Sequence, residues 1–247
     1  MAASWATGAM PIGNAVPPMR PARPTCPALY PPRNMPKRRN FGSLASRTAL
    51  LHALAHIELN AINLAWDIIA RFVPNRLPRE FFDDWVGVAA EEAEHFLLLS
   101  SRLADVGARY GDLPAHDGLW EAAAVTSGDL LARLAVVPLV LEARGLDVTP
   151  AMAARLERAG DTGSAAILQL IYQQEIGHVA VGRHWFDAFC QAQGLVPEQV
   201  FHDRVRRYFK GELKPPFNFA ARNAAGFPAH YYEPLVRSIA DDETRST

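Results

Sequence analysis

Apolar residues recur at helical spacing through several long stretches of this chain. One stretch covers about residues 43–72, and a second covers about residues 79–106 and ends near Gly107. Residues 73–78 between them hold two prolines, and each proline removes a backbone donor and restricts the residue before it. The pattern therefore predicts two long helices joined by a turn.

The second half of the chain repeats this organisation. Long helices are predicted at about residues 127–145 and 164–193, with a turn at residues 160–163 before the second of them. Shorter helices are predicted at about residues 197–209 and 228–239. Almost nothing in the pattern favours strands, so the predicted fold class is all-α.

Residues 108–126 connect the first pair of helices to the second. They contain Gly111, Pro114 and Gly118, and they leave room for one short helix at about residues 119–124. A largely extended segment of this length reaches about 40 Å, which is enough to run along a bundle. We therefore expect a four-helix bundle with a long crossover, in preference to simple up-down-up-down order.

Carboxylates interrupt the apolar faces at two places. Glu58 lies among Ile57, Leu59 and Ala61, and Glu142 follows the apolar run 136–141. Burying an unpaired carboxylate costs several kcal/mol unless it binds a cation or shares a proton. Both glutamates are therefore candidate metal ligands.

Each of these glutamates precedes a Glu-x-x-His motif at nearly the same distance, 34 residues in the first case and 33 in the second. Positions i and i+3 share one face of a helix, so each motif can direct a carboxylate and an imidazole to one point. Four carboxylates and two imidazoles are the ligand set of a dinuclear site inside a four-helix bundle. The six candidate metal ligands are Glu58, Glu92, His95, Glu142, Glu175 and His178.

The predicted turns fall midway between each lone glutamate and its motif. The midpoint is residue 75 in the first half and residue 158 or 159 in the second, just before Gly160. Residues equidistant from the turn of an antiparallel helical hairpin lie at the same height, so two such hairpins bring all four glutamates to one layer. The alternative, a coincidence of surface groups and buried salt bridges, leaves the turn positions unexplained.

The mixed oxygen and nitrogen ligands indicate which metal to expect. This set suits iron or manganese better than zinc, which favours tetrahedral sites richer in nitrogen or sulfur. We expect two iron ions, with manganese or a mixed iron and manganese pair as alternatives. Six protein ligands for two metals leave positions open for water, oxygen or substrate.

The blocks that hold the six ligands, residues 56–62, 91–96, 141–147 and 175–179, carry a resemblance to a known family. The chain resembles an uncharacterised bacterial family of the ferritin-like superfamily, a domain of unknown function, over about residues 21–227. The resemblance implies a ferritin-like di-iron carboxylate bundle in which Glu92 and Glu175 bridge the metals and Glu58 and Glu142 are terminal ligands. It implies no particular substrate.

Several neighbouring residues are weaker candidates. Tyr172, one turn before Glu175, is a candidate catalytic group with a redox or hydrogen-bonding role, and Glu91 is a candidate extra ligand or catalytic group. Simple packing of the tyrosine and solvation of the glutamate are the ordinary alternatives. His52 and His56 do not share the face of Glu58, so we expect structural roles for them. Candidate acceptors for the second ring nitrogens of the ligand histidines are Asp67, Asp147 and Asp187.

Charge is segregated along the chain. Residues 1–40 carry six basic residues, no acidic residue and nine prolines, whereas residues 41–201 carry 11 basic and 20 acidic residues. Residues 202–222 are again basic, with six basic and two acidic residues. We expect a Pro-rich basic arm at residues 1–42, the bundle at 43–195 and a helical extension packed on it at 196–247. The basic segments either lie against the acidic bundle or attract a polyanion such as tRNA.

The remaining composition limits the class of protein. Cys26 and Cys190 have neither a disulfide framework nor zinc-motif spacing, which favours a reducing compartment. No run of 18 apolar residues and no apolar stretch typical of a secretory signal is present. We expect a cytoplasmic protein without membrane association, and a homodimer is compatible with the sequence.

Three classes of protein use this ligand set. They are di-iron oxidases or hydroxylases that activate oxygen, ferritin-like proteins that oxidise and store iron, and manganese catalases. The basic arm and the C-terminal extension are additions that a storage-cage subunit does not need, so oxygen-dependent oxidation of an organic substrate is favoured. Such an enzyme needs an external electron donor, and a tRNA-modifying hydroxylase is one subcase by analogy of fold and charge.

Overall fold

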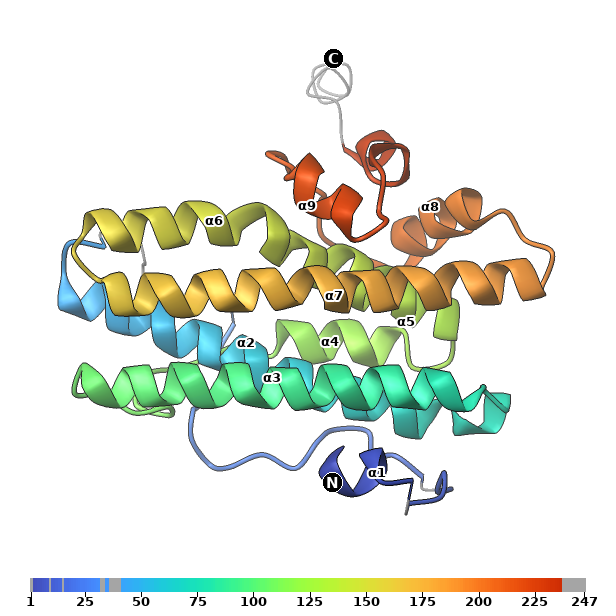
Figure 1. The fold of residues 1–247 in the computed structure, drawn as a ribbon, viewed down its shortest axis with the longest axis horizontal. Helices are drawn as coiled ribbons and strands as arrows, with labels where there is room; N and C mark the ends of the chain where they lie inside the picture. The colour runs from blue at the N-terminus through green and yellow to red at the C-terminus, as the bar shows by residue number, and fades with distance from the viewer. Residues whose placement is uncertain (1, 9, 15, 32–33, 36–40, 237–247) are drawn as a thin grey trace. The chain divides into compact units, whose positions relative to one another are not determined.

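The computed structural model describes residues 2–8, 10–14, 16–31, 34–35 and 41–236, and these residues are helical apart from turns, loops and one isolated bridge between Leu29 and Ala115 (Figure 1). The predicted all-α class is confirmed for them. The long helices are α2 (Leu44–Arg71), α3 (Arg79–Asp105), α6 (Ala143–Arg158) and α7 (Thr162–Ala192). The short elements are α1 (Ala2–Ala6), η2 (Val73–Asn75), α4 (Gly118–Val125), α5 (Leu130–Val136), the π-helix η3 (Val137–Glu142), α8 (Pro197–Tyr208), α9 (Phe219–Ala224), η4 (Ala229–Tyr231) and η5 (Glu233–Leu235).

The chain divides into two compact units, which are described separately. Unit 1 comprises Met1–Ser127 and Thr149–Gln174, and unit 2 comprises Gly128–Val148 and Glu175–Thr247. Both α6 and α7 are continuous helices that contribute to each unit. The domain boundaries expected at residues 42 and 195 stay a prediction.

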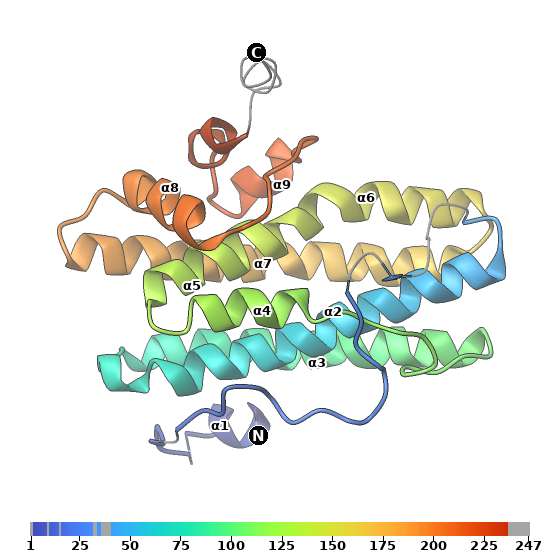
Figure 2. The ribbon, with the colours of Figure 1, turned by 180° about the vertical axis from the view of Figure 1, so that it is seen from behind.

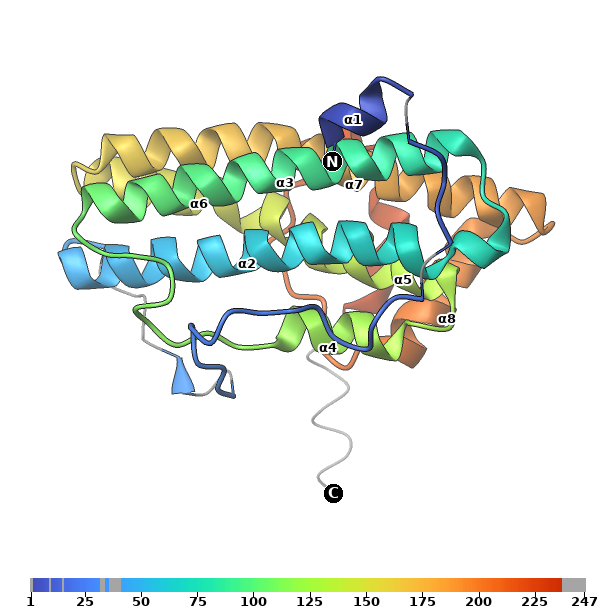
Figure 3. The same ribbon diagram turned by 90° about the horizontal axis from the view of Figure 1, so that it is seen from below.

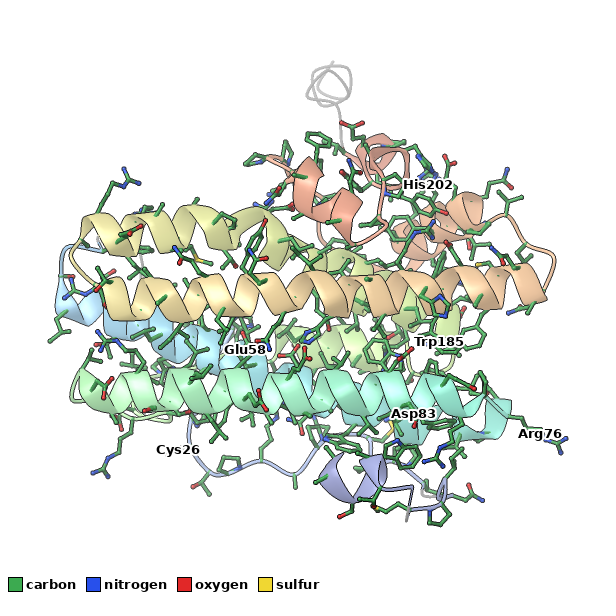
Figure 4. The ribbon with its side chains drawn as sticks, viewed as in Figure 1. Cys26, Glu58, Arg76, Asp83, Trp185 and His202 are labelled. Atoms are coloured by element: carbon green, nitrogen blue, oxygen red, sulfur yellow. The ribbon has the colours of Figure 1, made fainter. Side chains whose placement is uncertain are left out.

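In unit 1, α2 and α3 form the first predicted hairpin. Ser43 caps α2 by accepting a hydrogen bond from the backbone N–H of Ser46 at 3.3 Å. The chain then turns through η2, where Arg76 adopts a left-handed conformation with φ of 55° and projects outward (Figure 4). The break predicted from the two prolines is confirmed at this place.

Four helical segments share the hydrophobic core of unit 1. Each segment of α2, α3, α6 and α7 contributes buried aliphatic side chains, so the hairpin at residues 159–161 packs with the α2–α3 hairpin. Short alanine side chains alternate with leucines in this cluster, which allows close approach of the backbones. The central members are Leu50, Leu51, Ala55, Leu99, Leu103, Ala153, Leu156, Ala165, Leu168 and Ile171.

Asp161, the residue before α7, links the helices that form this core. Its Oδ1 accepts a hydrogen bond from the backbone N–H of Ser164 at 3.1 Å, and its carboxylate pairs with Arg102 of α3 at 2.8 Å and Arg47 of α2 at 3.2 Å. Burial acts to raise the pKa of Asp161, but the hydrogen bonds from Ser164 and Arg102 outweigh it and lower the pKa. One carboxylate thus joins three helices.

The N-terminal arm lies against α2 and the connection that follows α3 (Figure 3). Two backbone carbonyls accept side-chain hydrogen bonds, that of Pro18 from Arg71 on α2 at 3.0 Å and that of Met19 from Trp120 on α4 at 3.1 Å. Since these prolines and their neighbours cannot continue a helix, side-chain donors satisfy the exposed backbone. The arm therefore packs along α2 and α4 within unit 1.

Two basic side chains of the arm are bound by other residues of unit 1. Arg20 forms an ion pair with Asp117, and Arg23 donates to the side-chain oxygen of Asn60 at 2.5 Å and lies 3.7 Å from the same aspartate. For these two residues the contacts support the intramolecular alternative over a polyanionic partner. The other four basic residues of the arm lie outside the described residues.

His52 and His56 hold the connection after α3 in place. His52 Nε2 accepts the backbone N–H of Gly111 at 2.9 Å, and its ring stacks on Tyr110 with centroids 5.3 Å apart. His56 Nδ1 lies 2.8 Å from the Tyr110 hydroxyl, and its Nε2 lies 3.0 Å from the carbonyl of His116. Burial lowers the pKa of both rings, that of His56 to about 4. The structural roles expected for both histidines are confirmed.

In unit 2, α8 lies against α5 (Figure 2), and Phe201 of α8 packs on Phe186 and Phe227. A buried ion pair joins Arg222 of α9 to Asp147 of α6 at 2.7 Å. The guanidinium of Arg222 also lies 4.3 Å from the centre of the Tyr232 ring. The segment after α8 is therefore anchored to the start of α6.

Several predicted boundaries were wrong. The third long helix does not end at residue 145, because the chain continues through η3 and through Gly145 and Pro150 to Arg158. The helix predicted at residues 228–239 is replaced by the short turns η4 and η5, and its last three residues lie outside the described part. Neither α1 nor α9 was predicted, and α1 forms before the first proline of the arm. The short helix expected in the connection is confirmed as α4.

Among the described residues, no helix combines the length and the apolar character needed to cross a membrane.

We expect Asp161→Ala to destabilise the protein more than Asp161→Asn. The asparagine loses both ion pairs but still caps α7, and a cap is worth about 1 kcal/mol. Urea denaturation of the two variants and the wild type measures the difference. Equal unfolding free energies for all three proteins would show that this carboxylate does not join the helices as described.

Acid should weaken the contact made by His52. Because burial holds the folded-state pKa of His52 below 6.5, the unfolded state binds more protons as the pH falls through 6.5, and stability declines. His52→Gln removes this titration, so its unfolding free energy should fall less steeply between about pH 7 and pH 5. Parallel pH profiles for wild type and variant would contradict this account.

Candidate metal centre

Three of the six predicted ligands lie on the α2–α3 hairpin of unit 1. Glu58 is on α2 (labelled in Figure 4), and Glu92 and His95 lie one turn apart on α3. Their exposed fractions are 5%, 1% and 0%. Ala55 and Ala61, three residues to either side of Glu58, share its face, and their small side chains leave room for its carboxylate.

His95 lies between two carboxylates. Its Nδ1 is 3.5 Å from Glu58 Oε2 and 3.5 Å from Glu92 Oε2. Burial acts to lower the pKa of His95, but the two carboxylates outweigh it and raise the pKa to about 10. The same attraction acts on any other cation, so this pocket of negative charge favours metal binding once the imidazole is neutral.

Gln174 orients the imidazole of His95. The side-chain oxygen of Gln174 on α7 lies 2.9 Å from His95 Nε2. An amide oxygen only accepts, so Nε2 carries the proton in this bond and Nδ1 is left facing the carboxylates. Nδ1 is therefore the nitrogen that a cation would bind, and Gln174 supplies the outer hydrogen bond typical of a metal-bound histidine.

A fourth ligand joins this group. Among the described residues, one ligand atom each from Glu58, Glu92, His95 and Glu175 can be chosen so that all lie within 4.8 Å of one another. The side chain of Glu175 keeps 12% of its surface exposed. This buried cluster of glutamates and histidine could hold a metal ion.

The donor chemistry fits a cation. Three carboxylates and one imidazole are the donors that divalent iron and manganese accept, although the set does not identify the metal. Carboxylates this close together repel one another, and their burial removes the solvent that would screen them. A bound cation relieves both costs at once.

The remaining predicted ligands lie in unit 2. On α7, His178 is buried and its Nδ1 lies 3.4 Å from Glu175 Oε1, so the second motif has the internal geometry of the first. Glu142 is the last residue of η3 and is half-buried. Neither His178 nor Glu142 belongs to the four-residue group, so their role as ligands stays a prediction.

The expected partners for the ligand histidines were wrong in the case of His95. Gln174 bonds its second ring nitrogen, while the three aspartates pair with arginines: Asp67 with Arg71, Asp147 with Arg222 and Asp187 with Arg183. The signal available in the sequence was the polar residue directly before Glu175. Gln174 lies on the same helix as Glu175, but its side chain contacts His95 on α3. Sequence spacing alone does not reveal this contact.

Tyr172 and Glu91, the candidate catalytic groups, are half-buried on α7 and α3. Neither belongs to the four-residue group, and their catalytic role stays a prediction.

Comparison with known proteins places the chain among relatives of undefined activity. The family model described as "Protein of unknown function (DUF455)" matches residues 1–233. An uncharacterized protein of Haemophilus influenzae is 42% identical over 214 residues, which cover 85% of this chain and 74% of that protein. No solved structure matches the chain.

We expect Gln174→Ala to weaken metal binding while leaving the fold intact. Without the amide oxygen, the His95 ring is free to rotate, and loss of such an outer hydrogen bond typically costs about 10- to 100-fold in affinity. Titration with manganese(II) against a chelator measures the change. Gln173→Ala is the matched control, because Gln173 is the exposed neighbour on the same helix. Equal affinities for the two variants would remove Gln174 from the site.

Proposed function

The chain belongs to the DUF455 family, and because that family is described only as proteins of unknown function, we propose an activity from the candidate metal centre itself. The protein is a dinuclear-metal oxidoreductase, with two iron ions as the metals, that uses oxygen to oxidise or hydroxylate an organic substrate.

The single observation that carries the proposal is the group of Glu58, Glu92, His95 and Glu175. Its members come from helices far apart in the sequence, and three of them are almost completely buried. Proteins seldom bury ionisable groups together without a cation or a functional reason.

The second metal requires the rest of the ligand set. We infer from the tandem spacing that Glu142 and His178 supply it, as Glu58 and His95 do for the first. In the ferritin-like superfamily that the sequence resembles, the corresponding roles are bridging for Glu92 and Glu175 and terminal for Glu58 and Glu142. The parallel geometry of the two Glu-x-x-His motifs supports this inference.

The residues of the chain have separate tasks in this proposal. When bound, a reduced iron pair would supply the electrons that reduce oxygen, and the activated oxygen would oxidise the substrate. The carboxylates balance the metal charge, Gln174 keeps His95 Nδ1 directed at the site, and buried alanines around Glu58 exclude bulk water. Tyr172, one turn before Glu175, is the candidate to move a proton or an electron.

Two other activities use the same ligands. A ferritin-like iron-oxidising or iron-handling protein and a manganese catalase-like protein are the alternatives. Oxygen-dependent substrate oxidation is favoured because the arm packed along α2 and α4 and the helices after α7 are additions that an iron-storage subunit does not need.

The metal site is tested by its metal content. Purified protein should bind about two iron or manganese ions per chain, and Glu92→Gln with Glu175→Gln should abolish this binding. The matched control is Glu94→Gln with Glu157→Gln, because both of these glutamates are exposed. Metal analysis with circular dichroism separates loss of ligands from loss of fold. Unchanged metal content in the first double variant would refute the site.

Assays of the metal-loaded protein separate the three activities. The first is an absorption spectrum recorded after the reduced iron form is exposed to oxygen. Oxygen consumption coupled to an added reductant supports the oxidoreductase. Net deposition of ferric iron in a large cage supports iron handling, and peroxide disproportionation by the manganese form supports the catalase.

A further inference from the structure

Within unit 2, α7 and the π-helix η3 approach each other unusually closely at one point. A Cβ atom added to Gly182 on α7 would lie 2.4 Å from Cβ and 2.5 Å from Cγ of Pro138. Gly182 is buried, and the proline ring is rigid and cannot swing aside as the end of a long side chain can. Only glycine fits at this position without moving one of the two backbones.

The contact lies one helical turn from two predicted ligands. Glu142 follows Pro138 by four residues, and His178 precedes Gly182 by four residues. Because the chain runs in opposite directions along η3 and α7, both steps lead the same way from the contact (Figure 1). Glu142 and His178 therefore lie level with each other, one turn from the point where the backbones touch.

The π-helix explains why this contact matters for Glu142. A π-turn holds more residues than an α-turn and so rotates the side chains that follow it, which is why such turns recur at functional sites. In this chain η3 begins at Val137, contains Pro138 in its first turn and ends at Glu142. The direction of the Glu142 carboxylate thus depends on how η3 is seated against α7.

We propose that Gly182 is a positioning residue: its lack of a side chain admits Pro138, seats η3, and so sets Glu142 beside His178 as the ligand pair for the second metal. This inference rests on the proposed dinuclear site. It adds a residue that no ligand motif contains.

The distances decide how sensitive the site is to this contact. Carbon atoms in ordinary contact are about 3.5 Å apart or more, so a methyl group at position 182 pushes the backbones apart by about 1 Å. Metal–ligand distances tolerate only about 0.2 Å of error. A backbone shift that leaves the helices folded is therefore larger than the metal–ligand distances tolerate.

The test compares three variants of the full chain by iron and manganese content, circular dichroism and thermal unfolding. Gly182→Ala carries the added methyl group. Gly177→Ala is the matched control, since it makes the same substitution on the same helix at an exposed position next to His178, with no atom within 4 Å of the new Cβ. Pro138→Gly combined with Gly182→Ala moves the small residue to the other side of the contact and relieves the clash.

Gly182→Ala should fold and lose about half of the bound metal, from about two ions per chain to about one, because Glu58, Glu92 and His95 of the first site lie on helices that do not make this contact. Gly177→Ala should keep both ions, and the exchange variant should regain the second. A purely structural role for Gly182 would lower the unfolding temperature without changing the metal ratio, which would overturn the inference.

The outcomes also separate this inference from the proposed function. Wild-type protein that binds no metal would refute the dinuclear site, and the positioning role would fall with it. Wild-type and Gly182→Ala proteins that both bind two ions would refute the positioning role alone. Failure of the exchange variant to regain the second ion, when Gly182→Ala has lost it, would also count against the contact as the cause.

Discussion

The burial of carboxylates inside an apolar helical core is the constraint on which the rest of the structure depends. Glu58 and Glu92 lie almost without exposure on either side of His95, within 3.5 Å of its Nδ1. Such charges cost several kcal/mol to desolvate, and the cost is recovered only by a proton or a cation between them. The negative charge of these two carboxylates raises the pKa of His95, and the same charge attracts a metal cation.

Both apolar packing and ion pairs hold the candidate ligands at fixed positions along the helices. The leucines and alanines shared by four helical segments in unit 1 set the spacing, and Asp161 links α7 to α2 and α3 at one end. Gln174 then directs the ring of His95 from α7. In unit 2 the same need for a fixed distance is met differently, through the close contact between Gly182 and Pro138.

Sequence reasoning located the α2–α3 hairpin and the start of α7 well because prolines and glycines mark helix ends by local chemistry. It failed where tertiary packing overrides such signals. Gly145 and Pro150 look like helix terminators, yet α6 runs through both to Arg158. The π-turn at η3 was not predicted, since nothing in a run of apolar residues around one proline distinguishes i→i+5 hydrogen bonds from the i→i+4 bonds of an α-helix. Gln174 was missed because its partner lies 79 positions away in sequence.

The amino-acid sequence by itself determined the all-α class, the main helical hairpins and the identity of the candidate ligands, because helical periodicity and the i, i+3 spacing of Glu and His are local properties. Only the tertiary structure decided which of these groups meet. It grouped Glu175 with Glu58, Glu92 and His95, assigned Gln174 to His95, and paired the three candidate aspartates with arginines. Those choices depend on which helix faces lie opposite one another, and that is set by packing across distances the sequence pattern does not encode.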